Sequence, residues 1–271
     1  MFTTHRGHAT ELARAALRDG CDLVVAVGGD GTFNEVVNGM VARDGKAVNP
    51  DVGLGLIPLG TGSDFARTVN IPSDEDAAVQ RLTRAAKDVP LDLGRITFHQ
   101  AGKPAVRFFV NVSGMGFDAE VIARLEDSGK RGGGTIPYYR ALLGAIFRFR
   151  NFDVKITIDG RIVRGNINPI VVCNGKYFGG GMKIGPNAIL NDGKFHVMLG
   201  RDFTALELLL ATPRLYTGSI LKHQKVTEYV AKTITVESPT PIPTEADGEL
   251  IGECEGPTTF EIIPAALKLR L

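Results

Sequence analysis

A glycine-rich segment with an acidic residue at its centre, Gly28 to Gly39 (GGDGTFNEVVNG), has the composition of a phosphate-binding turn. A glycine turn between a strand and a helix lets backbone N–H groups approach phosphate oxygens closely. Asp30 is an unfavourable neighbour for phosphate unless a Mg²⁺ ion lies between the two charges, so the segment indicates a magnesium nucleotide. A bare Gly-Asp-Gly is more often an ordinary turn, but Thr32, Asn34 and Glu35 on the polar face of the following helix favour binding.

A second segment of this kind, Pro58 to Thr68 (PLGTGSDFART), also places glycines and small hydroxyl residues after an apolar run. Alone it could be a turn with a helix cap, since Ser63 and Asp64 are good capping types. Both segments follow runs typical of parallel strands, and ligands collect at the carboxyl ends of such strands. We therefore expect the two turns to face one crevice.

The third segment is Glu245 to Leu250 (EADGEL). Most Asp-Gly pairs in a β domain are hairpin turns, and this is the simpler interpretation. Glu249 adds a second carboxylate close to Asp247, and a carboxylate at a phosphate-binding crevice can accept the proton of an attacking hydroxyl. Both interpretations stay open for this segment.

Apolar periodicity predicts the elements that hold these segments. Before residue 93 it predicts helices over residues 8–17, 33–41, 64–69 and 73–86 and strands over 22–27 and 53–58, which is typical of an α/β layer with a parallel sheet. After residue 93, alternating runs with Asp-Gly turns predict a second, largely antiparallel domain. Its strands are expected over 107–113, 154–158, 167–173, 195–199, 233–237 and 259–263, and its helices over 117–127, 137–149 and 204–211.

Four segments in order, GGDGTFNEVVNG, PLGTGSDFAR, GGGMKIGPNAILNDGKF and ADGE, resemble the diacylglycerol kinase and sphingosine kinase superfamily over nearly the whole chain. The first segment alone is shared with NAD kinases and, more loosely, phosphofructokinases, whereas the ordered set is much more specific. The resemblance implies an α/β plus all-β fold with a cleft between two domains. Residues 1–93 would form an NAD-kinase-like α/β nucleotide-binding domain, residues 94–257 an antiparallel β-sandwich that binds the acceptor, and the tail 258–271 would pack back on the first domain.

The resemblance also implies roles for individual residues. Glu249 is expected to be the proton acceptor, with Asp247 and Asp30 acting through Mg²⁺ or by orienting groups. Contacts with ATP are expected at Thr3, Gly29, Asp30, Gly31, Thr32, Phe33, Asn34, Glu35 and Thr61. A Mg²⁺ ion is expected on the side chain of Asp192 and on the carbonyl oxygens of Ile189 and Lys194.

The sequence departs from the family pattern in two places. Family members usually begin with a strand and an Asn-Pro-x-Ser-Gly turn that helps to hold ATP, whereas this sequence starts at the THRGHA segment. We expect either a start truncated relative to the full gene product or a neighbouring subunit, as in a homodimer, that supplies the missing part. Ser63 stands where Asn is commoner in the family.

Composition limits the other partners. Lys and Arg number 31 against 30 Asp and Glu, so the net charge of +1 provides no global field that attracts nucleic acid, and no nucleic-acid partner is expected. The three cysteines lack metal spacing, and no apolar run is long enough to span a bilayer. We therefore expect a cytoplasmic protein whose membrane contact is transient and peripheral, at the inner face.

Two further segments have competing interpretations. Gly114 to Ala119 (GMGFDA) matches a permissive dinucleotide-binding pattern, but no second parallel strand ending in an acidic residue follows about twenty residues later, so it predicts tight strand–helix packing. The helix expected over residues 137–149 could line the entry for an acyl chain, although a core helix with arginines reaching solvent is the simpler interpretation.

The sequence thus predicts an ATP-dependent lipid kinase that transfers the γ-phosphoryl group of MgATP to a lipid hydroxyl, of diacylglycerol or a related lipid. Two alternatives stay open. One is an NAD kinase-like enzyme with a soluble acceptor, which rests on GGDGT alone, and the other is a non-catalytic nucleotide-binding protein.

Overall fold

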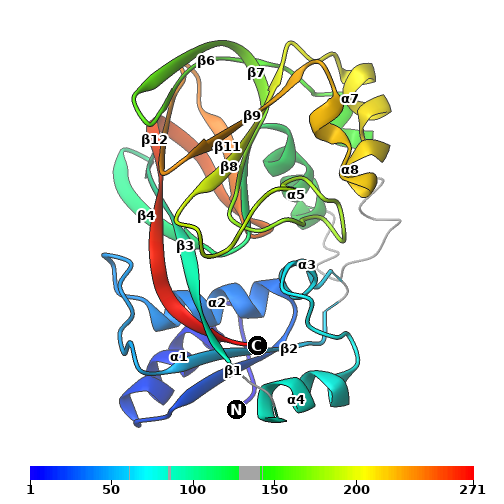
Figure 1. The fold of residues 1–271 in the computed structure, drawn as a ribbon. Coiled ribbons are helices and arrows are strands. Elements are labelled where there is room, and N and C mark those ends of the chain that lie inside the picture. Colours follow the sequence, from blue (N-terminus) through cyan, green and yellow to red (C-terminus); the bar gives the residue numbers. More distant parts are fainter. Residues whose placement is uncertain (61, 85–86, 128–140, 142) are drawn as a thin grey trace.

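The computed structural model describes residues 1–60, 62–84, 87–127, 141 and 143–271, which form an α/β part and a larger β-rich part (Figure 1). The α/β part, in blue and cyan, lies at the bottom of the view, and the β-rich part lies above it. Within the described ranges no helix is long and apolar enough to cross a membrane.

The α/β part follows the apolar periodicity. It contains helix α1 (His8–Arg18), strand β1 (Leu23–Gly28), helix α2 (Asp30–Met40), strand β2 (Gly53–Pro58), helix α3 (Asp64–Thr68) and helix α4 (Glu75–Arg84). Strands β1 and β2 pair in parallel, with their last residues Gly28 and Pro58 opposite each other. The two glycine segments therefore leave the sheet at the same edge.

The β-rich part is built from antiparallel pairs, as the fold class predicts. Its strands are β3 (Asp88–Gln100), β4 (Lys103–Phe109), β5 (Val112–Met115), β6 (Phe152–Ile158), β7 (Arg161–Cys173), β8 (Phe195–Arg201), β9 (Val226–Ala231), β10 (Thr233–Glu237), β11 (Ile242–Ala246) and β12 (Glu249–Arg270). The helices with described bounds here include α5 (Phe117–Asp127), α7 (Ala205–Ala211), α8 (Pro213–Thr217) and the 3₁₀ turn η1 (Ile220–Lys222). The turn between β6 and β7 has positive φ at Asp159 (44°) and Gly160 (86°), which an Asp-Gly hairpin turn requires.

Two long strands, β3 and β12, run through both parts. They pair antiparallel with each other, and the end of β12 also pairs in parallel with β2, where Lys268 lies opposite Gly53. Figure 1 shows β12, in red, descending from the β-rich part to the chain terminus beside β2. The end of the chain therefore completes the parallel sheet of the α/β part.

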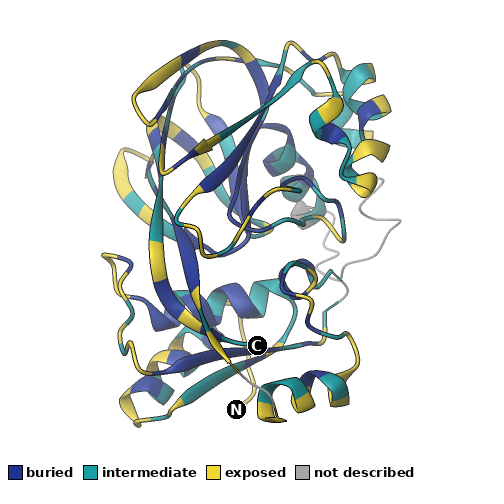
Figure 2. Cartoon of the chain, viewed as in Figure 1, coloured by how far each residue is buried: buried dark blue, intermediate teal, exposed yellow. Residues whose placement is uncertain are grey.

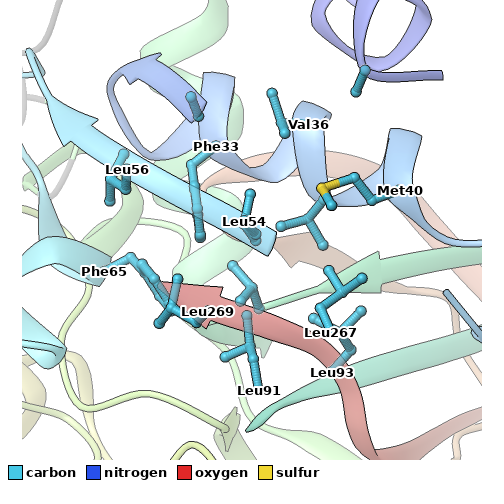
Figure 3. Packing of buried hydrophobic residues seen from close by; sticks show 14 of the residues in the cluster. Phe33, Val36, Met40, Leu54, Leu56, Phe65, Leu91, Leu93, Leu267 and Leu269 are labelled. Carbon is cyan, nitrogen blue, oxygen red and sulfur yellow. The ribbon is translucent and has the colours of Figure 1, made fainter. Parts of the chain in front are cut away.

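The core of the α/β part includes side chains from both long strands. Figure 3 shows Phe33, Val36 and Met40 of α2, Leu54 and Leu56 of β2, Phe65 of α3, Leu91 and Leu93 of β3, and Leu267 and Leu269 of β12 in one cluster. The rings of Phe33 and Phe65 are stacked with centroids 4.4 Å apart, and both are buried. Burial of such a side chain contributes about 1.5–3 kcal/mol, so this stack holds together the helices that follow the two glycine turns.

One expected strand, over residues 107–113, is wrong. Strands β4 and β5 are separated at Val110 and Asn111. The carboxylate of Asp247 accepts hydrogen bonds from the backbone N–H groups of Val110 (2.7 Å), Asn111 (2.9 Å) and Val112 (3.0 Å). These N–H groups are therefore satisfied by a side chain, and the chain can leave the strand ladder here.

Two other expectations are only partly covered by the structure. Of the helix expected over 137–149, residues 137–140 and 142 lie outside the described residues, and residues 141 and 143–146 are helical. The helix expected over 73–86 is confirmed as α4, and residues 85–86 are outside the description. Figure 2 shows buried positions along both long strands, while exposed positions gather on α4 and on the outward side of α7 and α8.

Candidate active site

The two glycine turns lie against each other at the carboxyl ends of β1 and β2. A methyl group on Gly60 would lie 2.5 Å from the Cα atom of Gly29, so only glycine allows the two backbones to approach this closely. At Gly31, in contrast, none of the described residues outside the adjoining turn of α2 has an atom within 4 Å of the position that a methyl group would take. Residues of both turns line one cavity of about 460 Å³, which confirms that they face a single crevice.

Asp30 connects the first turn to the second. Its carboxylate accepts hydrogen bonds from the backbone N–H groups of Asp64 (3.1 Å) and Phe65 (3.0 Å). Asp30 therefore caps helix α3, a role that the sequence suggested for Ser63. The hydroxyl of Ser63 instead donates a hydrogen bond to the carbonyl oxygen of Gly60 at 2.8 Å. Asp30 also lines the cavity, so this carboxylate fixes the second turn and faces the space beside the first.

Asp64 connects the turns to the β-rich part. Its Oδ2 accepts a hydrogen bond from the N–H group of Gly180 at 2.7 Å, and its Oδ1 accepts one from the guanidinium of Arg67 at 3.0 Å. Burial raises the pKa of Asp64 to about 6, and the charge of Asp30 adds to the rise, against the lowering by Gly180 and Arg67. The sequence indicated Asp64 only as a capping residue.

The segment EADGEL is a hairpin turn between β11 and β12, with positive φ at Asp247 (50°) and Gly248 (81°). The Asp247 side chain nevertheless points inward. Besides the three N–H groups of the β4–β5 connection, it accepts a hydrogen bond from Nδ2 of Asn34 at 2.6 Å. Burial raises the pKa of Asp247 to about 6, and these hydrogen bonds oppose the rise. Asp247 thus links α2, the β4–β5 connection and the last hairpin.

Glu249 is the first residue of β12 and lies outside the set of residues that line the cavity. Its Oε2 lies 2.5 Å from Nη2 of Arg107 and 3.5 Å from Nη2 of Arg6. Arg107 also donates to Oδ1 of Asn34 at 2.9 Å. Because Asn34 is one helical turn after Asp30, the expected proton acceptor is connected through Arg107 to the helix of the first glycine turn.

The other residues expected at ATP have varied surroundings. Thr3 lies in the exposed segment before α1, Phe33 is a core residue, and the side chain of Thr32 packs against Gly28. Thr61 is outside the described residues. Of the described positions, buried Phe33 offers no side chain to a nucleotide, so a contact there would depend on the backbone of the turn.

Glu35 contacts helix α1. Its two carboxylate oxygens accept hydrogen bonds from the backbone N–H groups of Gly7 (2.7 Å) and Ala9 (3.1 Å). Gly7 precedes α1 and has no side chain that could cap the helix, so Glu35 satisfies N–H groups that the helix leaves unpaired. Both oxygens of Glu35 therefore stabilise the packing of α1 on α2.

The three residues expected to bind a metal share the loop before β8. Oδ1 of Asp192 accepts a hydrogen bond from the N–H group of Lys194 at 3.1 Å, and Ile189 is half exposed. Nearby, Asp92 accepts a hydrogen bond from the N–H group of Gly193 at 2.7 Å. The described residues contain no group of three or more His, Cys, Asp or Glu side chains that could hold a metal ion. Mg²⁺ at this loop would therefore be held by one carboxylate, carbonyl oxygens and water, which fits its preference for oxygen ligands.

Away from the glycine turns the cavity is apolar. Its walls include Val121, Ile122 and Leu125 of α5, Met198 of β8, Leu208 of α7 and Leu215 of α8. An apolar chamber with a few polar groups at one end is typical of a small-molecule site. Because the chamber and the glycine turns belong to one cavity, the site is suited to an amphipathic ligand.

Two carboxyl groups that were not predicted, those of Asp118 and Glu245, also line the cavity. Asp118 lies in the first turn of α5 and Glu245 in β11, and the carboxyl groups of both lie next to Gly114. Burial raises the pKa of Asp118 to about 7 and the pKa of Glu245 well above its ordinary value. The segment GMGFDA joins β5 directly to α5, so it forms the tight strand–helix packing that was expected. Its one signal for a site was an acidic residue two positions after the second glycine.

Comparison with known proteins agrees with this two-part fold. Residues 1–96 match the family model described as diacylglycerol kinase catalytic domain, and residues 111–271 match the YegS C-terminal NAD kinase beta sandwich-like domain. The chain is 30% identical over 260 residues to a diacylglycerol kinase of Bacillus subtilis (strain 168), covering 94% of this chain and 80% of the relative. It is 31% identical over 272 residues to a protein of Klebsiella pneumoniae (strain 342) named probable lipid kinase YegS-like. The match covers 99% of this chain and 84% of that relative. The crystal structure of a diacylglycerol kinase from Bacillus anthracis str. Sterne superposes on this structure with a TM-score of 0.70 at 22% sequence identity. The superposition covers 99% of this chain and 83% of the other, which supports the fold.

Proposed function

The chain belongs to the diacylglycerol kinase family, and we propose that it is a lipid kinase that transfers the γ-phosphoryl group of ATP to a hydroxyl of diacylglycerol or a related lipid. The observation that carries the proposal is the single cavity of about 460 Å³ that joins the two glycine turns to an apolar chamber. An acceptor whose chains occupy the chamber would direct its polar end toward the turns. Phosphoryl transfer depends mainly on such positioning and on charge stabilisation.

The phosphates of ATP would bind at the first glycine turn. The N–H groups at the start of α2 and the helix dipole favour an anion there. The open space beside Gly31 leaves room for phosphate oxygens, and the contact between Gly29 and Gly60 holds the two turns together. Asp30 and Asp64 are the carboxylates of these turns that line the cavity, so they would hold the Mg²⁺ that accompanies ATP, and the ion would offset the charge of the phosphates.

Glu249 is proposed to accept the proton of the acceptor hydroxyl. As the hydroxyl oxygen bonds to the γ-phosphorus, its proton would pass to the Glu249 carboxylate, and the bond from the γ-phosphorus to the β-phosphate oxygen would break. Arg107 contacts both Glu249 and Asn34, which favours one orientation of the carboxylate. Asp247 lines the cavity from the same hairpin and is the alternative acceptor.

A surface on α7 and α8 supports transient contact with a membrane. Leu206, Leu210 and Tyr216 are 64%, 69% and 47% exposed, on the same two helices whose Leu208 and Leu215 line the chamber. Figure 2 shows exposed residues on the outward side of both helices. An exposed apolar face next to a lipid-sized chamber is suited to a lipid surface.

The test is transfer of label from the γ-phosphate of MgATP to a total bacterial lipid extract, with NAD as a parallel acceptor. Wild type is expected to label a lipid, and Glu249→Ala is expected to bind ATP but to label nothing. Glu253→Ala, an exposed position on the same strand, serves as the control and should behave as wild type. Labelled NAD alone would indicate a kinase of a soluble acceptor. A lipid labelled by Glu249→Ala would remove Glu249 from the proposed role.

A further inference from the structure

Two carboxyl groups of the cavity lining meet at Gly114. A methyl group on Gly114 would lie 2.8 Å from Oδ2 of Asp118 and 3.1 Å from Oε1 of Glu245, so both oxygens border the same small space. Both residues line the cavity. None of the described residues that line the cavity is a lysine or arginine, so no cationic side chain in that lining neutralises the pair.

The two acids differ in how well they are satisfied. Oε2 of Glu245 accepts a hydrogen bond from the N–H group of Gly248 at 2.8 Å. Oδ2 of Asp118 is closed off from solvent and has no hydrogen-bond partner among the described residues. Buried polar atoms in folded proteins are almost always paired, and an unpaired carboxylate oxygen is destabilising. Asp118 is therefore suited to a donor on a bound molecule.

The position of Asp118 indicates which part of an acceptor it would meet. Val121 and Leu125 lie three and seven residues further along α5, on the same helix face, and line the apolar chamber. The glycine turns lie at the other end of the cavity. An acceptor with its chain against Val121 and its reactive hydroxyl toward Gly31 therefore brings its head group to Asp118.

We propose that Asp118 and Glu245 form a head-group site that accepts a hydrogen bond from a second hydroxyl on the lipid acceptor, next to the hydroxyl that is phosphorylated. The proposal rests on the proposed lipid kinase function and adds a rule for its choice of acceptor. Acceptors with two neighbouring hydroxyls, such as monoacylglycerols, bind in preference to acceptors that lack the second donor.

A neutral hydroxyl matches this pair better than an ammonium group. Burial raises the pKa of both acids, and the charge of Asp118 adds to the rise at Glu245, so the pair retains a proton near neutral pH. A hydroxyl can donate to the unprotonated oxygen and accept from the protonated carboxyl at the same time. A methyl ether in its place can only accept.

The test compares monooctanoylglycerol with its analogue in which the 2-hydroxyl is a methyl ether, both below the micelle concentration. Equilibrium binding to the full chain is measured without ATP, so this result does not depend on catalysis. Wild type is expected to bind the diol about tenfold or more tightly, because a site built to hydrogen-bond a hydroxyl rejects the analogue that lacks the donor. Asp118→Leu, which keeps the branched shape without the acceptor oxygens, is expected to bind both compounds equally.

Glu120→Gln is the matched control. Glu120 lies two residues along α5, pairs with Arg124 at 3.3 Å and is outside the cavity lining, so this variant should keep the wild-type preference. Thermal unfolding of each variant checks the fold, and Asp118→Ala, which also lacks the acceptor oxygens, replaces Asp118→Leu if the leucine variant is less stable than wild type. Absence of a preference in wild type, or an unchanged preference in the folded Asp118 variant, would overturn the proposal.

A kinetic comparison separates this proposal from the kinase proposal. With MgATP, the ratio of kcat/KM for the two compounds should follow the binding ratio in wild type and fall to about one in the Asp118 variant. Diol-selective binding without labelled product would contradict the kinase proposal while supporting the head-group site. If product is labelled but the kcat/KM ratio is the same in wild type and the Asp118 variant, the kinase proposal is supported and the head-group site is contradicted.

Discussion

Nδ2 of Asn34, on the helix of the first glycine turn, donates a 2.6 Å hydrogen bond to Oδ2 of Asp247, which lies 213 positions later in the last hairpin. The same carboxylate accepts the N–H groups between β4 and β5, starting at Val110. One side chain therefore couples the helix of the first glycine turn, the β4–β5 connection and the turn that precedes Glu249. Its removal should affect the fold as well as the site.

Asp247→Ala is expected to lower the free energy of unfolding by about 2–4 kcal/mol, because it leaves several donors unpaired in a buried place. Urea unfolding measures the change. Asp159→Ala is the control, because Asp159 also begins an Asp-Gly hairpin turn with positive φ and accepts backbone N–H groups, from Lys232 and Thr233, but is exposed. Water can replace the Asp159 carboxylate as the acceptor, so Asp159→Ala should lower the free energy of unfolding by about 1 kcal/mol or less. Equal losses would show that the buried carboxylate has no special structural role.

Gly31→Ala is expected to fold normally and to bind ATP about tenfold more weakly, a loss of about 1.4 kcal/mol. Outside the adjoining turn of α2, the described residues have no atom within 4 Å of the added carbon, so the methyl group would occupy space that phosphate oxygens need. Isothermal titration with MgATP and thermal unfolding measure the two effects. Gly60→Ala should instead lower the Tm, since its methyl group would lie 2.5 Å from the Cα of Gly29. Unchanged ATP affinity in folded Gly31→Ala would count against this phosphate site.

Elements that depend on neighbouring residues were predictable from the sequence. Helix α1, strand β1 and the Asp159–Gly160 turn follow from local periodicity and turn chemistry, which act over a few residues. The shared crevice of the two glycine turns was also predictable, because carboxyl ends of adjacent parallel strands share one sheet edge.

Features set by distant residues were not predictable. The run over 107–113 is apolar enough for one strand, and it is interrupted by Asp247, which lies 135 positions after Val112. Glu35 has the residue type of a ligand contact, yet it caps α1. An acidic residue in a first helical turn, such as Asp118, ordinarily complements the helix dipole, so its sequence position does not show that it faces a cavity.

Stability is expected to depend on pH through Asp118. Burial raises the pKa of Asp118 from 3.8 to about 7, so between these values the folded protein holds a proton that the unfolded chain releases. Its contribution to stability is therefore present below about pH 4 and lost as the pH rises through 7. Asp118→Asn cannot release this proton. The free energy of unfolding of Asp118→Asn minus that of wild type should therefore be about 2–4 kcal/mol larger at pH 8 than at pH 4.

Urea unfolding of both proteins from pH 4 to pH 8 measures this difference. Asp64 and Asp247, whose pKa values are raised to about 6, also make stability fall with pH, but they do so in both proteins and cancel in the comparison. Glu120→Gln, which removes a carboxylate from the same helix, should run parallel to wild type. Parallel curves for Asp118→Asn as well would show that the Asp118 pKa is not raised.

Asp192→Ala is expected to raise the Mg²⁺ concentration needed for half-maximal lipid phosphorylation while leaving kcat unchanged at saturating Mg²⁺. The reason is that Asp192 is the one carboxylate among the three residues expected to bind this ion, and Ile189 and Lys194 would provide only carbonyl oxygens. Mg²⁺ titrations at fixed MgATP measure the effect. Asp153→Ala, at an exposed position on β6, should leave the titration unchanged. An identical titration for wild type and Asp192→Ala would remove this loop from metal binding.

Leu206→Ser combined with Leu210→Ser is expected to weaken binding to phosphatidylglycerol vesicles about tenfold or more, because the two side chains would lose contact with the lipid. Activity on a short-chain acceptor in free solution should stay near wild type, since both residues face away from the chamber that Leu208 lines. Vesicle sedimentation and the two activities are measured together. Ile162→Ser removes an equally accessible apolar side chain, 53% exposed on β7, and should leave vesicle binding intact. If Ile162→Ser weakens binding as much as the double variant, the effect is general surface hydrophobicity, and α7 is not the membrane contact.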